Sequence, residues 1–169
     1  MKSVGIIVAV AVALALQTTL GRFVPAGTIA VDLVLVVVVY VALTSGPGIG
    51  LLTGTFAGLV QDALSSNVIG IGGLAKTIVG FLAGILGTQF IVAQSLPRFV
   101  VFFGATVAHA IVFMGLYMLL DLRHFGAPYA AVAGQAVGNA VVGVVAFQVV
   151  ELLPGAVERR RSQRTRLRR

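Results

Sequence analysis

The chain has 169 residues, of which 59% are hydrophobic and only 10% are charged. Soluble domains carry about 25% charged residues, so this chain has too few to cover a surface that faces water. It contains no cysteine, which excludes disulfides, thiolate metal sites and cysteine nucleophiles, and its net charge of +7 comes mostly from one end. The composition therefore predicts a polytopic membrane protein without a soluble domain between its spans.

Six apolar segments follow one another along the chain, separated by short breaks that carry glycine, proline and serine. They cover residues 4–20, 28–44, 50–66, 73–93, 99–120 and 129–153. About 20 helical residues cross a hydrocarbon core of roughly 30 Å. The segments predict an all-α membrane helix bundle of about six transmembrane helices, with one transmembrane domain at 1–153 and a basic tail at 154–169.

The first segment, which follows Lys2, has two interpretations. It is a retained transmembrane helix, or it is a secretory signal peptide that is cleaved after a run such as Ala13-Leu-Ala15. Because more membrane follows it rather than a polar mature domain, we favour the retained helix.

Basic residues are distributed unequally over the two sides of such a bundle. With both termini on one side, that side holds Lys2, Arg98 and the seven arginines of the tail, whereas the other side holds only Arg22 and Arg123. An excess of lysine and arginine marks the cytoplasmic side of a membrane protein. Both termini are therefore predicted to be cytoplasmic.

Small residues recur along three of the predicted helices at a spacing that places them on one face. The third helix carries Gly50, Gly54, Gly58 and Asp62, the fourth carries Gly73, Gly80, Gly84 and Gly87, and the sixth carries Gly134 and Gly138 beside a face with Gln135, Asn139 and Gly143. Such stripes let helix backbones approach closely in a membrane. We expect a tight bundle, with Gly50, Gly54, Gly58, Gly80 and Gly84 as packing positions.

The stretch GIGGLAKT, residues 70–77, differs from a phosphate-binding loop only at Ala75. Such a loop follows a β-strand, which holds its amides around the phosphates. Here apolar helices are predicted on both sides, and the stretch lies on the side away from cytoplasmic ATP. We therefore interpret it as helix packing rather than as a nucleotide site.

Asp32, Asp62 and Lys76 are ionisable residues in the predicted spans, and alternating topology puts all three near the outer face. Each costs several kcal/mol if it is left alone in hydrocarbon. An ion pair, for example between Asp62 and Lys76 across their short connection, would relieve both costs. We expect either such a structural pair, which we favour, or a site for a ligand, a proton or a partner.

The remaining polar residues give no sign of catalysis. His109 lies alone within the fifth segment, where we expect it to be hydrogen bonded, and His124 lies in an outer connection. Neither has a second histidine or a carboxylate at helical spacing, and no hydrolase or zinc-protease motif occurs. We predict no metal, no cofactor and no enzymatic activity.

The tail arginines include Arg159, Arg160, Arg161 and Arg164. A basic cluster next to a span is attracted to anionic lipids by about 1 kcal/mol per residue. We expect contact with lipid or with an acidic cytoplasmic partner. Nucleic acid is not expected, because the tail lacks aromatic residues and a nucleic-acid-binding fold.

The run GTFAGLVQDALSS at residues 54–66, followed by Ile69-Gly70 and Leu74, resembles the MreD family of rod-shape-determining proteins. That family shows a G-x-x-x-G-[LI]-x-x-D segment and an L-G-x-x-x-L-like turn into the next helix. The aliphatic run after Asp32 also matches, although Val31 stands where the family tends to have proline, and Lys76 is not part of the family pattern. The likeness is best over about residues 32–84.

The resemblance implies a non-catalytic component of the bacterial cytoplasmic (inner) membrane that acts in cell elongation and peptidoglycan synthesis. It implies MreC as the first partner, with MreB, the RodA glycosyltransferase and its penicillin-binding transpeptidase in the same complex. The family is also similar to the six-helix substrate-binding components of energy-coupling-factor vitamin transporters, which leaves a transporter subunit as an alternative. The absence of Trp and the presence of only three Tyr disfavour an aromatic-lined ligand cavity.

Overall fold

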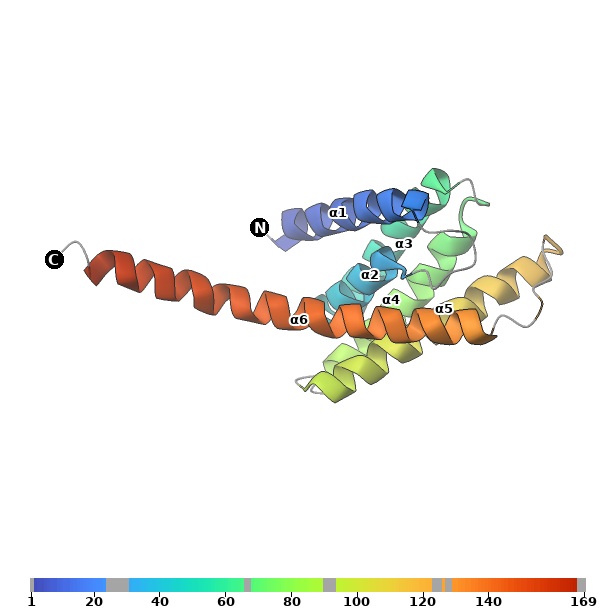
Figure 1. Ribbon diagram of the computed structural model, residues 1–169. Helices are drawn as coiled ribbons and strands as arrows, with labels where there is room; N and C mark the ends of the chain where they lie inside the picture. Colours follow the sequence, from blue (N-terminus) through green and yellow to red (C-terminus); the bar gives the residue numbers. More distant parts are fainter. Residues whose placement is uncertain are drawn as a thin grey trace.

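The computed structural model describes residues 2–23, 31–65, 68–89, 94–122, 126 and 129–166, and within these ranges it describes no side chains for residues 2, 21–23 and 153–166. The described chain is all-α. Its six helices are α1 (Lys2–Phe23), α2 (Leu33–Ser45), α3 (Pro47–Leu64), α4 (Ile71–Gln89), α5 (Ser95–Leu119) and α6 (Tyr129–Arg166). Figure 1 shows them as one bundle from which the end of α6 projects. The predicted all-α helix bundle is confirmed.

Two predicted boundaries are wrong. The second helix begins at Leu33 rather than at residue 28, because Asp32 is its N-cap and accepts a hydrogen bond from the Leu35 amide at 2.9 Å. The sixth helix does not end at residue 153 but continues to Arg166. A proline removes one backbone hydrogen bond and crowds the carbonyl four residues earlier, but the residues after Pro154 are mostly good helix formers and the helix continues.

Length and composition qualify four of the six helices as membrane spans. These are Ser3–Leu20 of α1, Ile71–Gln89 of α4, Ser95–Leu119 of α5 and Tyr129–Leu152 of α6. The helix α2 is apolar but has only 13 residues, a length of about 20 Å. The helix α3 has 18 residues and includes polar ones.

The short helix α2 lies at the centre of the bundle. It contacts α1, α3, α4, α5 and α6, and Val34, Leu35 and Val38 are at most 1% exposed. A helix that is buried on all sides is apolar all round, which explains the unbroken aliphatic run of its sequence. One apolar cluster joins α2 to α4, α5 and α6, and a second joins it to α1 and α3.

The turn between α2 and α3 is a single glycine. Gly46 has a φ of +89°, which favours glycine, and Pro47 at the start of α3 is compatible with the first turn of a helix. The chain therefore reverses at once, and α3 runs antiparallel to α2. The same relation holds between α3 and α4, since Pro47 lies beside Gly84 and Gly58 lies beside Gly73.

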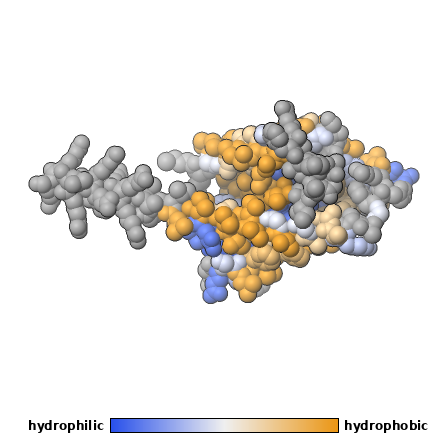
Figure 2. Space-filling view, in the orientation of Figure 1, coloured by the Kyte–Doolittle hydropathy of each residue, from blue (hydrophilic) through white to orange (hydrophobic). Residues whose placement is uncertain are grey.

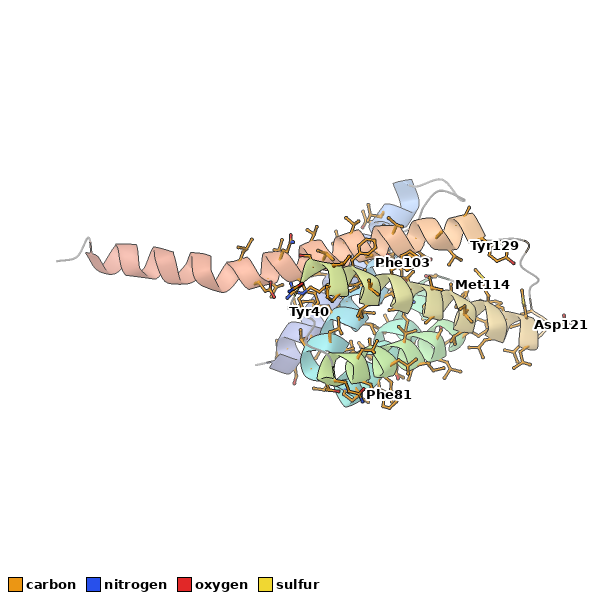
Figure 3. The ribbon with its side chains drawn as sticks, turned by 90° about the horizontal axis from the view of Figure 1, so that it is seen from below. Tyr40, Phe81, Phe103, Met114, Asp121 and Tyr129 are labelled. Carbon is orange, nitrogen blue, oxygen red and sulfur yellow. The ribbon has the colours of Figure 1, made fainter. Side chains whose placement is uncertain are left out.

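The described surface of the bundle is largely apolar. Figure 2 shows hydrophobic side chains over most of the described part of one face. Figure 3 places Asp121, which follows α5, and Tyr129, which begins α6, at one end of the bundle, whereas Tyr40 of α2 lies towards the other end. The end of α5 and the start of α6 therefore lie at the same end of the bundle, as expected for two consecutive antiparallel spans.

Candidate functional site

The glycine stripe of α3 lies directly against α4. A Cβ added to Gly58 would lie 2.6 Å from the Gly73 Cα, and one added to Gly54 would overlap the Lys76 carbonyl oxygen. The same contact continues along the pair, where Gly50 faces Gly80. Van der Waals contact between bare backbones is what small-residue stripes provide in membranes. The five predicted packing glycines therefore all lie between α3 and its neighbours, because Gly84 lies against Pro47.

Asp62 continues this stripe and closes its end. Its Oδ2 accepts hydrogen bonds from the amides of Gly70 and Gly73, each at 3.0 Å, and the residue is 4% exposed. Amides at the start of a helix have no intrahelical acceptor. The Asp62 carboxylate supplies one, and its negative charge also suits the positive end of the helix dipole of α4.

Lys76 pairs with Asp32, not with Asp62. The Lys76 Nζ lies 3.0 Å from the Asp32 Oδ2, and both residues are buried. The predicted pairing with Asp62 is wrong because the Asp62 carboxylate is directed at the backbone amides of α4. The counter-ion of Lys76 is therefore Asp32, the N-cap of α2, although the two residues are far apart in the sequence.

The sequence showed no second histidine or carboxylate at helical spacing to His109, but the fold brings Lys76 to it. Its Nε2 lies 3.3 Å from the Lys76 Nζ, so the lysine contacts one group on α2 and one on α5. The ring of His109 also stacks on Phe113 with a centroid separation of 5.7 Å. Since an ammonium group only donates, His109 Nε2 is the acceptor of this contact and His109 is neutral in this arrangement.

Asn139 of α6 makes buried hydrogen bonds to the start of α2 and to α5. Its Oδ1 accepts a hydrogen bond from the backbone amide of Asp32 at 2.9 Å, and its Nδ2 donates to the Thr106 hydroxyl at 3.1 Å. The Thr106 hydroxyl in turn donates to the Phe102 carbonyl. Asn139 is completely buried. Sequence reasoning noted its polar face on the sixth helix but assigned it no partner.

The polar cluster Asp32–Lys76–His109–Asn139 therefore joins four helices. Each of these residues comes from a different helix or helix end, namely α2, α4, α5 and α6. Gln17 of α1 adds a fifth, since its amide accepts from the Leu33 amide at 2.8 Å and donates to the Val31 carbonyl at 3.0 Å. The start of α2 is thus held by side chains from both ends of the sequence.

A second ion pair lies towards the other end of α5 and α6. Arg98 donates from Nη1 to the Glu151 Oε2 at 3.0 Å and from Nη2 to Glu151 Oε1. The guanidinium carbon also lies 4.5 Å from the centroid of the Phe147 ring. Sequence reasoning counted Arg98 only as a topological charge, and no helical spacing pointed to Glu151, which lies 53 residues further along the chain.

This arrangement is suited to holding helices together. The Lys76 ammonium group of the polar cluster contacts the Asp32 carboxylate and the His109 ring, and the Asn139 amide accepts from the Asp32 backbone. Among the described residues no group of three His, Asp or Glu could hold a metal ion. His124 and the side chains of Arg159, Arg160, Arg161 and Arg164 lie outside the described part, so their predicted roles stay predictions.

Comparison with known proteins identifies the family. The family model described as rod shape-determining protein MreD matches residues 1–154 of the chain. The chain belongs to the MreD family. Searches of curated proteins and of solved structures gave no significant match.

Membership of the MreD family indicates a role in determining rod shape. It extends the likeness that the sequence showed at residues 32–84 to almost the whole helical bundle. It also favours a shape-determining membrane protein over the alternative of a transporter subunit. The GIGGLAKT stretch is helical from Ile71 onward, and its lysine is used in the buried pair with Asp32.

Proposed function

We propose that this chain is a non-catalytic, multi-pass component of the bacterial inner membrane that binds MreC and helps to organise peptidoglycan synthesis. The observation that carries the proposal is the family match over residues 1–154. MreB, RodA and the penicillin-binding transpeptidase would act in the same complex.

The internal use of the polar groups supports a scaffold. Asp32, Asp62 and Lys76 are satisfied within the bundle, so they stabilise a fixed shape on which other proteins can assemble. The glycine stripe is likewise occupied by α4. A partner would therefore meet the opposite, exposed faces of α3 and α4 rather than the stripe itself.

The orientation belongs to the same proposal. The six helices cross the membrane with both termini in the cytoplasm, and the short helix α2 is surrounded by the other five. Cytoplasmic lysine and arginine outnumber those outside in this arrangement. The basic end of α6 then lies where anionic lipids or an acidic partner can meet it.

Site-specific photo-crosslinking in cells tests the proposal. The reactive residue replaces Leu52 or Phe56 of α3, or Phe81 of α4, which are 67%, 58% and 41% exposed. We expect crosslinks to MreC from at least one of these positions. Ala57, which is fully buried on α3, is the matched control and should give none.

Two results would contradict the proposal. Failure of every exposed position to capture a component of the elongation complex, in cells whose rod shape the variants support, would exclude partner contact through α3 and α4. Loss of the gene product without any change in cell shape would exclude the function itself.

A further inference from the structure

A cavity of about 860 Å³ lies between the second halves of α1 and α3. Figure 1 shows the ends of these two helices close together. Apolar Leu14 and Leu64 and polar Gln17, Thr18, Gln61 and Ser65 are among its lining residues. Its volume falls in the range of about 300–1,000 Å³ that is usual for small-ligand sites.

Gln61, one of the lining residues, has an unused acceptor. Its Oε1 is buried and has no hydrogen-bond partner within the described part of the chain. Leaving a buried acceptor unpaired costs about 1–3 kcal/mol, and the great majority of such atoms in folded proteins are paired. A donor from outside this chain would remove that cost.

Two of the other polar side chains of the cavity are already engaged. Gln17 is held at both ends of its amide by the backbone around Asp32, and Thr18 donates to the Ala15 carbonyl at 3.0 Å. They form a polar wall, whereas Leu14 and Leu64 form an apolar one. None of the lining residues in the described ranges is charged.

We propose that this cavity binds the neutral, hydrogen-bond-donating head of an amphiphile. A hydroxyl or amide of the ligand donates to Gln61 Oε1, and its apolar part lies against Leu14 and Leu64. The described lining residues carry no charge, so they complement a neutral head. The hollow between α4 and α5, about 750 Å³ and lined by residues such as Val79, Leu86 and Ala105, offers no comparable acceptor and serves as the reference site.

Tryptophan fluorescence can test this directly, because the chain contains no tryptophan. Leu64→Trp reports on the cavity, and Leu86→Trp reports on the reference site; both positions are exposed. The full-length variants are reconstituted in phosphatidylcholine vesicles and titrated with a brominated monoacylglycerol, which carries two hydroxyls. The methyl ester of the same brominated fatty acid, which has no donor, is the control ligand.

We expect the monoacylglycerol to quench Leu64→Trp at a concentration about three- to tenfold lower than the ester, as one net hydrogen bond would give. The two quenchers should act equally on Leu86→Trp. Adding Gln61→Leu should abolish the preference at Leu64→Trp. Unchanged quenching of Leu86→Trp in the Gln61→Leu background shows that this variant is folded.

A third quencher distinguishes the source of the ligand. The water-soluble 3-bromo-1,2-propanediol carries the same diol without an acyl chain. If Gln61→Leu weakens quenching by this diol, the site takes ligands from the aqueous side. If Gln61→Leu weakens quenching by the monoacylglycerol alone, the site takes membrane amphiphiles. Equal quenching by monoacylglycerol and ester, with no effect of Gln61→Leu on any quencher, would overturn the proposal.

Discussion

At the scale of single residues, Lys76 shows how a charge is accommodated inside this bundle. Its ammonium group contacts the Asp32 carboxylate at 3.0 Å and the His109 ring at 3.3 Å, and it is 3% exposed. Removing one partner of a buried pair leaves the other charge without compensation, which costs more than removing both.

We expect Asp32→Asn and Lys76→Met each to lower the free energy of unfolding by about 3–5 kcal/mol. The double variant should lose clearly less than the sum of the two single losses, because it leaves no unpaired charge. Thermal or denaturant unfolding of the purified proteins in detergent measures all four members of this cycle. Additive losses would show that the two residues do not interact.

A parallel cycle with Asp62 is the control. Asp62→Asn combined with Lys76→Met should be additive within about 0.5 kcal/mol, since these side chains share no contact. Rescue of one substitution by the other would favour the pairing first expected from the sequence.

Asp62 itself is predicted to act as a helix cap. Asp62→Ala removes the acceptor of the Gly70 and Gly73 amides and should cost about 1–2 kcal/mol of unfolding free energy. Asp62→Asn keeps an acceptor oxygen and should cost less than half as much. Equal losses in the two variants would mean that the carboxylate charge, rather than the hydrogen bonds, is what α4 requires.

At this scale the sequence singled out three ionisable residues but did not predict all of their partners. Asp32, Asp62 and Lys76 stand out because charges are rare in apolar helices. Pairing Asp62 with Lys76 relied on their proximity in the sequence, whereas the actual partner is determined by the register between α2 and α4. The contacts of His109 and Asn139 depend on how α5 and α6 pack against α4 and α2, which no local spacing encodes.

At the scale of helices, the contact between α3 and α4 depends on the absence of side chains. Gly54 and Gly58 face the α4 backbone directly, whereas a Cβ on Gly104 or Gly115 of α5 would meet nothing within 4 Å. The four-residue spacing was enough to predict the stripe, because it is a local property of one helix. The spacing does not indicate which helix packs against the stripe.

Leucine at Gly54 or Gly58 should force the two helices apart. We expect Gly54→Leu and Gly58→Leu to lower the unfolding temperature strongly and to fail to restore rod shape in cells that lack the protein. Gly104→Leu and Gly115→Leu are matched controls and should fold normally. Normal stability of the Gly58→Leu variant would contradict the close packing of α3 on α4.

At the scale of the whole molecule, the basic residues of the sequence predict the orientation in the membrane. Reporters fused after Arg169 or placed in the segment 94–98 should read cytoplasmic, whereas one in the segment 121–128 should read external. A cytoplasmic signal from segment 121–128 would contradict the arrangement of six crossings.

The basic end of α6 should be separable from the bundle. Replacing the seven arginines of residues 159–169 with glutamine should weaken binding to vesicles that contain anionic lipid, by up to about 1 kcal/mol per residue, and leave the unfolding temperature nearly unchanged. A matched set of vesicles without anionic lipid gives the reference. A large fall in the unfolding temperature would assign a structural role to this end of the helix.

The shortness of α2 has a consequence for how the protein enters the membrane. A helix of 13 residues is about 10 Å shorter than the hydrocarbon core, and its neighbour α3 has bare backbone on one face. Neither helix is suited to move by itself from the translocation machinery into the lipid. We therefore expect α2, α3 and α4 to partition into the lipid together, after Gln89 has been synthesised, so that a nascent chain stalled before that point remains accessible from water.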